Sequence, residues 1–140
     1  MSAGTGVRHS EFNASKTDPV HFLQIWILPS TQGTAPSYAQ KLFPDSDKQG
    51  KLRLVVSPDG ADGSVTLSQD VRLYAAVLAG GEKVEHVVRP GRHAWIQVTS
   101  GKVRVGADTL EAGDGAATSD PGSLALEGEE RAEVLVFDLP

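Results

Sequence analysis

The chain is built from short runs of β-branched, aromatic and other apolar residues, interrupted every few positions by residues that favour turns. Fifteen glycines and eight prolines among 140 residues supply many of these interruptions. An amphipathic helix needs a long stretch with an apolar stripe of 3.6-residue period, and no part of the sequence carries one. Short strands separated by turns are typical of β-sandwiches and β-barrels, so the sequence predicts an all-β fold.

The alternation of apolar and polar residues predicts eleven strands. They are Val20–Leu28, Tyr38–Phe43, Leu52–Ser57, Val65–Gln69, Arg72–Ala79, Glu82–Val88, His93–Thr99, Lys102–Val105, Gly115–Thr118, Ser123–Glu127 and Ala132–Asp138. Two runs, His21–Leu28 and Val134–Phe137, are apolar on both faces, so we expect them to be central strands. Ser100 and Gly101 predict a two-residue hairpin between the strands on either side, with the glycine at positive φ.

The polar and charged stretch Pro44–Gly50 is the best candidate for a domain boundary. The residues after it are numerous enough for a small complete β-domain, whereas those before it are too few for one. We therefore expect one complete domain in residues 45–140 and an incomplete unit in residues 1–44.

The charge balance disfavours a nucleic-acid role, and the absence of cysteine excludes thiol-based sites. Acidic residues outnumber basic ones 18 to 13, and the lysines and arginines are scattered, so no basic surface for nucleic acid or an anionic membrane is expected. A chain without cysteine forms no disulfide and no zinc–thiolate site. No signal-peptide run and no apolar stretch near the roughly 20 residues of a membrane span is present, so we expect a cytoplasmic protein.

His9 and Glu11 are the candidate metal ligands. They are two residues apart, a spacing that puts both side chains on one face of a strand. An imidazole and a carboxylate suit a divalent first-row metal, but such sites usually take three or four protein ligands. The alternative, which we favour for the chain by itself, is that the pair lies on a frayed segment without a metal.

The other histidines offer weaker candidates. His86 and His93 would face one cavity only if their strands were neighbours, and we favour the alternative that each is a strand residue without such a role. No Gly-x-Ser-x-Gly element is present, so a hydrolase nucleophile is not indicated.

Two stretches resemble the pirin and quercetin 2,3-dioxygenase-like family of two-cupin proteins. The elements Gly4-Thr-Gly6, His9-Ser-Glu11 and Gln24-Ile-Trp26 occur in order and resemble the second half of its N-terminal cupin. The β-rich remainder, ending in Phe137-Asp-Leu-Pro140, resembles its C-terminal cupin. The resemblance implies that residues 1–44 are the C-terminal strands of an incomplete N-terminal cupin. It also implies that residues 45–140 form a cupin, a jelly-roll or double-stranded β-helix barrel.

The resemblance also implies an activity, metal-dependent quercetin (flavonol) 2,3-dioxygenation. Family members hold iron or another divalent transition metal with three histidines and one glutamate, of which one histidine and the glutamate match His9 and Glu11. The two others belong to a His-x-His motif that this sequence lacks. In a complete site Glu11 would also accept a proton from the substrate hydroxyl. With half the ligands absent, we expect the isolated chain to be non-catalytic and to hold a metal weakly or not at all.

Three alternatives are open. In the first, the chain is a protein-interaction or structural cupin module. In the second, it binds a small ligand inside its C-terminal barrel. In the third, it forms a homodimer through exposed N-terminal strands, which brings two His9 and Glu11 pairs together into one metal site.

Overall fold

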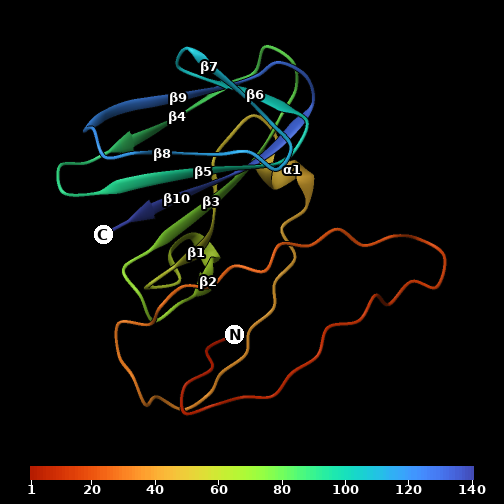
Figure 1. Cartoon of the computed structure of the whole chain (residues 1–140), viewed down its shortest axis with the longest axis vertical. Helices are drawn as coiled ribbons and strands as arrows, with labels where there is room; N and C mark the ends of the chain where they lie inside the picture. The colour runs from red at the N-terminus through yellow and green to blue at the C-terminus, as the bar shows by residue number, and fades with distance from the viewer.

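The computed structural model describes all 140 residues and consists of two facing β-sheets with a long N-terminal segment beneath them (Figure 1). The prediction of an all-β fold is confirmed. The elements are α1 (Asp45–Lys48), β1 (Arg53–Ser57), a 3₁₀ turn (Ala61–Gly63), β2 (Val65–Thr66), β3 (Arg72–Leu78), β4 (Lys83–Val88), β5 (His93–Ser100), β6 (Lys102–Val105), β7 (Asp108–Glu111), β8 (Gly115–Thr118), β9 (Gly122–Gly128) and β10 (Ala132–Leu139). No helix is long and apolar enough to cross a membrane.

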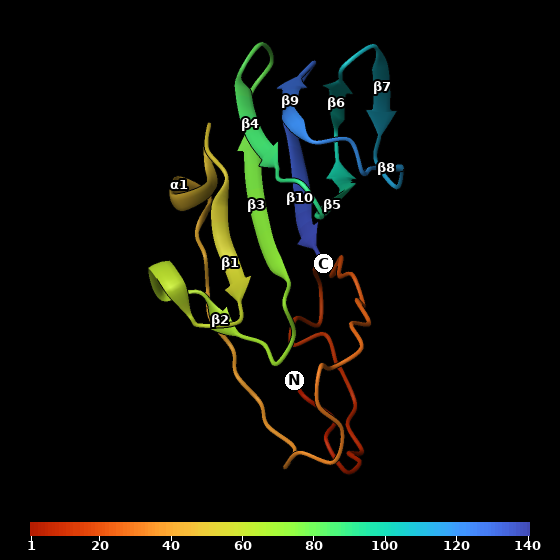
Figure 2. The ribbon, with the colours of Figure 1, turned by 90° about the vertical axis from the view of Figure 1, so that its left-hand side faces the viewer.

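The strand order is that of a jelly roll. One sheet has six strands in the order β2-β1-β3-β10-β5-β8, and the other has four in the order β4-β9-β6-β7. Figure 2 shows β3 and β10 side by side, with β4 and β9 above them. All hydrogen-bonded strand pairs among β3 to β10 are antiparallel. The chain passes repeatedly between the two sheets, as in cupin barrels.

The core lies between the two sheets and is aliphatic over most of its length. On β4 exposed and buried residues alternate strictly, which places Val84 and Val88 inside the barrel. Ten buried residues form one cluster, namely Ala76, Leu78, Val84, Ile96, Val98, Val103, Leu126, Ala132, Val134 and Val136. β10 pairs with β3 on one side and β5 on the other, so the prediction of a central strand at Val134–Phe137 is confirmed.

The prediction of a hairpin at Ser100 and Gly101 is wrong, although Gly101 has the predicted positive φ. Gly101 has φ +72°, but β5 belongs to the six-stranded sheet and β6 to the four-stranded one. The turn therefore carries the chain from one sheet to the other. In the four-stranded sheet β6 pairs with β7 on one side and β9 on the other.

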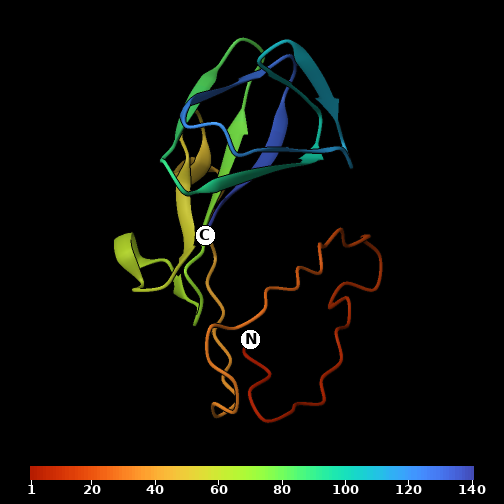
Figure 3. The ribbon, with the colours of Figure 1, turned by 60° about the vertical axis from the view of Figure 1, so that its left-hand side comes forward.

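The predicted strands Val20–Leu28 and Tyr38–Phe43 are also wrong. Residues 1–44 contain no strand, and their single ladder contact is an isolated antiparallel bridge between Ser2 and Ser37. The segment makes a wide loop away from the barrel (Figure 3). A strand needs a neighbour for its N–H and C=O groups, and no such neighbour lies beside residues 20–28. Trp26, expected in a central strand, is 87% exposed.

A few contacts tie this N-terminal segment to the barrel. The backbone N–H of Ser30 donates to the Ser68 carbonyl at 3.0 Å, and the Gln69 amide donates to the Leu28 carbonyl at 2.7 Å. Phe43 lies beneath the guanidinium of Arg53, whose central carbon is 5.3 Å from the ring centre. Two of these contacts involve the loop after β2 and the third involves Arg53 on β1.

Candidate functional site

The His9 and Glu11 side chains lie beside one another. His9 Nε2 is 3.9 Å from Glu11 Oε1, and the two side chains are 40% and 57% exposed. No strand positions them, because the surrounding residues are loop. The spacing still brings an imidazole and a carboxylate together, as the sequence predicts for a pair of metal ligands.

The donor set around this pair does not fit a resident first-row metal. No group of three or more histidine, cysteine or acidic side chains in the structure is arranged to hold a metal ion. A two-donor pair on an exposed loop leaves most of the coordination sphere to water, whereas metal centres usually take three or four protein ligands. The role of His9 and Glu11 as metal ligands therefore stays a prediction, and the two side chains by themselves do not make a metal site.

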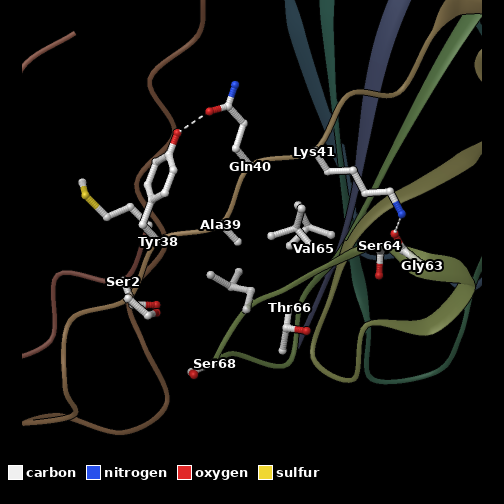
Figure 4. A pocket seen from close by; sticks show the side chains of 14 residues that line it. Ser2, Tyr38, Ala39, Gln40, Lys41, Gly63, Ser64, Val65, Thr66 and Ser68 are labelled. Atoms are coloured by element: carbon white, nitrogen blue, oxygen red, sulfur yellow. Dashed lines mark hydrogen bonds between the residues drawn. The ribbon is translucent and has the colours of Figure 1, made fainter.

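A hollow of about 670 Å³ separates the N-terminal segment from the loops around β2 (Figure 4). Its walls carry hydroxyl groups, including those of Ser64 and Thr66. The Tyr38 hydroxyl donates to Gln40 Oε1 at 2.7 Å, and the Lys41 ammonium donates to the Gly63 carbonyl. Because its polar groups bond to one another and no acid–base pair faces it, we assign no chemistry to this hollow.

His86 and His93 do not face a common cavity. His86 lies on β4 in the four-stranded sheet and His93 begins β5 in the six-stranded sheet. His93 is exposed, and its Nδ1 is 2.7 Å from the Ser119 hydroxyl. His86 is only 7% exposed and points inward. The two histidines therefore have different surroundings and do not form one site.

A charged cluster inside one end of the barrel escaped the sequence patterns. Asp138 continues the inward-facing positions of β10 and is 6% exposed. Arg92 closes over it, with Nε donating to Asp138 Oδ1 at 2.6 Å and Nη1 donating to Asp70 Oδ2 at 2.6 Å. The signal was present in the sequence, because an aspartate at the next alternate position after Val134 and Val136 must point into the barrel.

His86 completes this cluster. Its Nε2 is 3.8 Å from Asp138 Oδ2, too far for a hydrogen bond, and its ring centre is 5.5 Å from that of Tyr74. Burial lowers the pKa of His86 from its ordinary value near 6.5, and Arg89 lowers it further, while Asp138 opposes the shift. Burial likewise raises the pKa of Tyr74. Both groups are therefore favoured in their neutral forms.

The lowered pKa of His86 makes stability depend on pH. The unfolded chain binds the His86 proton more readily than the folded chain, so folding is penalised as pH falls below about 6.5. We expect His86→Gln to lose less stability than the wild-type chain between pH 7.5 and 5.5. Urea unfolding of both proteins at closely spaced pH values measures this difference in stability, since the contributions of the other titratable groups cancel in the comparison. Parallel pH profiles for the two proteins would contradict the assignment.

Two family models match the chain. The model described as the quercetinase C-terminal cupin domain covers residues 54–139, and the model described as pirin covers residues 1–27. Both agree with the resemblance seen in the sequence. Within the second range lie His9 and Glu11.

Curated relatives carry corresponding names. A protein of Escherichia coli K12 named quercetin 2,3-dioxygenase is 43% identical over 140 residues, which is 100% of this chain and 59% of the relative. A pirin-like protein of Caulobacter vibrioides is 34% identical over 140 residues, covering 99% of this chain and 60% of the relative. The chain thus spans about 59% of the length of such relatives.

Solved structures show the same architecture. The crystal structure of the bacterial pirin YhhW from Escherichia coli in complex with nickel(II) matches with a TM-score of 0.76 and 37% identity. The match covers 82% of this chain and 48% of that one. Because the quercetinase C-terminal cupin model covers more than half of the chain, we conclude that this protein belongs to the pirin and quercetinase family of cupins.

Proposed function

We propose that residues 1–140 provide one cupin barrel and half of the metal ligands of a quercetin 2,3-dioxygenase-type centre, and are non-catalytic by themselves. The observation that carries this proposal is the His9 and Glu11 pair, whose side chains lie 3.9 Å apart without a third ligand in reach. The names of the relatives and the nickel in bacterial pirin support a metal-dependent centre acting on a flavonol.

The missing ligands explain why the isolated chain should not turn over substrate. The free energy of metal binding comes from the complete set of deprotonated ligands, so a half set binds a divalent metal far more weakly. The exposure of both side chains adds to this, because water competes for every coordination position. A metal held this loosely would not be fixed in place to orient a flavonol and dioxygen.

The test is oxygen uptake with quercetin after incubation with iron(II) or nickel(II) and desalting. We expect uptake equal to the metal-free blank and far less than one bound metal per chain. The Escherichia coli relative at 43% identity serves as the positive control in the same assay. Turnover of about 1 s⁻¹ or faster, within the ordinary range of enzymes, would overturn the proposal.

A second candidate is a homodimer that rebuilds the site. Its support is the apolar surface on the N-terminal segment, where Phe12, Leu28 and Leu42 are more than four-fifths exposed. Large apolar side chains this exposed are unusual on a monomer when they gather together, and burying them would favour association. Two copies packed through these segments would bring together two histidines and two glutamates.

The preparation used for oxygen uptake also decides between the two candidates. Light scattering should give twice the monomer mass for the dimer, together with one metal per two chains and loss of that metal in His9→Ala. A monomer mass across the accessible concentrations would exclude the rebuilt site and leave the non-catalytic barrel.

A further inference from the structure

A groove of about 450 Å³ lies between the outer face of the six-stranded sheet and residues 23–27 of the N-terminal segment. Trp95 and Gln97 on β5, and Phe137 and Leu139 on β10, alternate with the residues of these strands that face the interior of the barrel. They therefore point to the opposite side of the sheet, where they form one wall of the groove. The volume of the groove falls within the range of small-molecule sites, about 300–1,000 Å³.

The aromatic part of this wall is held in place by the barrel. Trp95 lies opposite Phe137 in the register of β5 and β10. The indole of Trp95 lies over Gly115 on β8, because a Cβ atom added to Gly115 would collide with Trp95 Cζ2 and come within 3.0 Å of Cε2. The indole thus occupies the space that a side chain at Gly115 would need. Trp95 is still 40% exposed, so part of a fixed aromatic ring remains free to contact a ligand.

The other wall is an extended segment that does not fill the space above the sheet. Leu23 and Ile25 are 42% and 43% exposed, whereas Phe22 and Trp26 are 60% and 87% exposed. This alternation places Leu23 and Ile25 on the side toward the barrel. Apolar side chains packed directly on a sheet would be buried, so their exposure reflects the open groove beneath them. No hydrogen bond fixes residues 23–27 to the sheet, so this wall is free to adjust to a ligand.

One polar atom of the groove is oriented and has no partner. Gln97 Nε2 donates to the carbonyl oxygens of Gly113 at 3.1 Å and Asp114 at 2.9 Å, which fixes the orientation of the amide. Gln97 Oε1 accepts no hydrogen bond within the chain, and it is not among the fully buried unpaired atoms, so it stays accessible. An amide oxygen needs a donor, and the hydroxyl group of a ligand supplies one.

The groove carries no charge. Seven of its ten lining residues are hydrophobic, and the others are two glutamines and a glycine. A charged ligand would lose its hydration without meeting an opposite charge, whereas a flat, uncharged ring would stack favourably on the indole.

We propose that this groove, outside the barrel, binds a small uncharged aromatic molecule whose hydroxyl group donates to Gln97 Oε1. None of the lining residues is a histidine or an acid, so the site is independent of the His9 and Glu11 pair. It therefore stands or falls separately from the proposed dioxygenase function.

The test uses the indole N–H signals in NMR spectra of the full chain, because both tryptophans of the sequence line the groove. The probe is 2-naphthol, compared with 2-naphthoate, which is charged, and trans-2-decalol, which has no aromatic ring. We expect a saturable shift of the Trp95 signal with 2-naphthol and a Kd of about 0.1–1 mM. The other two compounds should bind about tenfold more weakly or not at all. 2-Methoxynaphthalene lacks the donor and should bind about threefold to tenfold more weakly than 2-naphthol.

Variants of the chain supply the matched comparison. Trp95→Ala removes the ring and Gly115→Ala displaces it, so each should weaken 2-naphthol binding about tenfold. The control is Tyr38→Ala, because Tyr38 is an aromatic residue, 72% exposed, that lies outside the groove, and binding should be unchanged. A His9→Ala/Glu11→Ala variant should also bind like the wild type.

The ligand series uses the wild-type chain, so it tests the site even where a variant does not fold. No saturable shift with 2-naphthol, equal binding of 2-naphthoate, or equal weakening in Tyr38→Ala and Trp95→Ala would overturn the site. A change of the indole signals on dilution without ligand would also overturn it, because a second copy of the chain would then fill the groove.

Discussion

Replacing Arg92 by alanine should lower the free energy of unfolding by about 3 kcal/mol. The substitution leaves Asp138, which is 6% exposed, without the guanidinium that binds both its carboxylate and its backbone oxygen. Removing one member of a buried ion pair is far more costly than removing both, because the remaining charge stays buried. Urea unfolding followed by far-ultraviolet circular dichroism measures the loss.

The control for this prediction is Arg131→Ala. Arg131 also pairs with an aspartate, donating to Asp45 Oδ2 at 2.7 Å, but both side chains are about 60% exposed. An exposed pair contributes roughly 1 kcal/mol or less, so the control should change stability little. Equal losses in the two variants would show that Asp138 does not depend on Arg92.

Replacing Gly101 by valine should destabilise the fold by about 2–5 kcal/mol. Gly101 has φ +72°, a conformation that β-branched residues avoid. A Cβ atom there would also meet the Arg131 carbonyl oxygen at 2.2 Å and the Ala132 Cα at 2.7 Å. Both obstacles are backbone atoms, so the turn that carries the chain between the two sheets would have to move. Thermal and urea unfolding measure the effect.

Gly106→Val separates the two contributions. Gly106 has nearly the same backbone conformation, φ +62°, but a Cβ atom there meets nothing within 4 Å. It should show only the conformational penalty, about 1–2 kcal/mol. If the two valine variants lose the same stability, the close approach of β10 to the Gly101 turn is not a constraint.

Local patterns predicted much of the barrel. β6 and β8 match their predicted bounds, and the central position of β10 follows from its apolar faces. The errors concern partners that lie outside the local pattern. Val20–Leu28 has the composition of a strand, but hydrogen bonding to a neighbour decides whether it becomes one. The positive φ of Gly101 was predicted correctly, but the backbone conformation of a turn does not specify which sheet receives the next strand.

The same distinction between local pattern and distant partner applies to the candidate sites. The spacing of His9 and Glu11 predicted one face of a strand; the two side chains lie 3.9 Å apart, but on a loop. The cluster of His86, Arg92 and Asp138 was missed because His86 and Asp138 are far apart in the sequence and meet only when β4 faces β10. The sequence indicates only that Asp138 follows the inward-facing positions of an apolar strand. It does not indicate that Arg92 or His86 lies beside this aspartate.

The position of β10 sets an order of events during synthesis. β3 and β5 leave the ribosome before β10, yet they become parts of one sheet only when β10 has been inserted between them. Until then each presents a free edge with strong strand-forming residues, and such edges pair readily with other nascent chains. The interval between translation of β5 and β10 is therefore the period in which this barrel is most exposed to misassembly. Slower elongation between these two strands would lengthen that period.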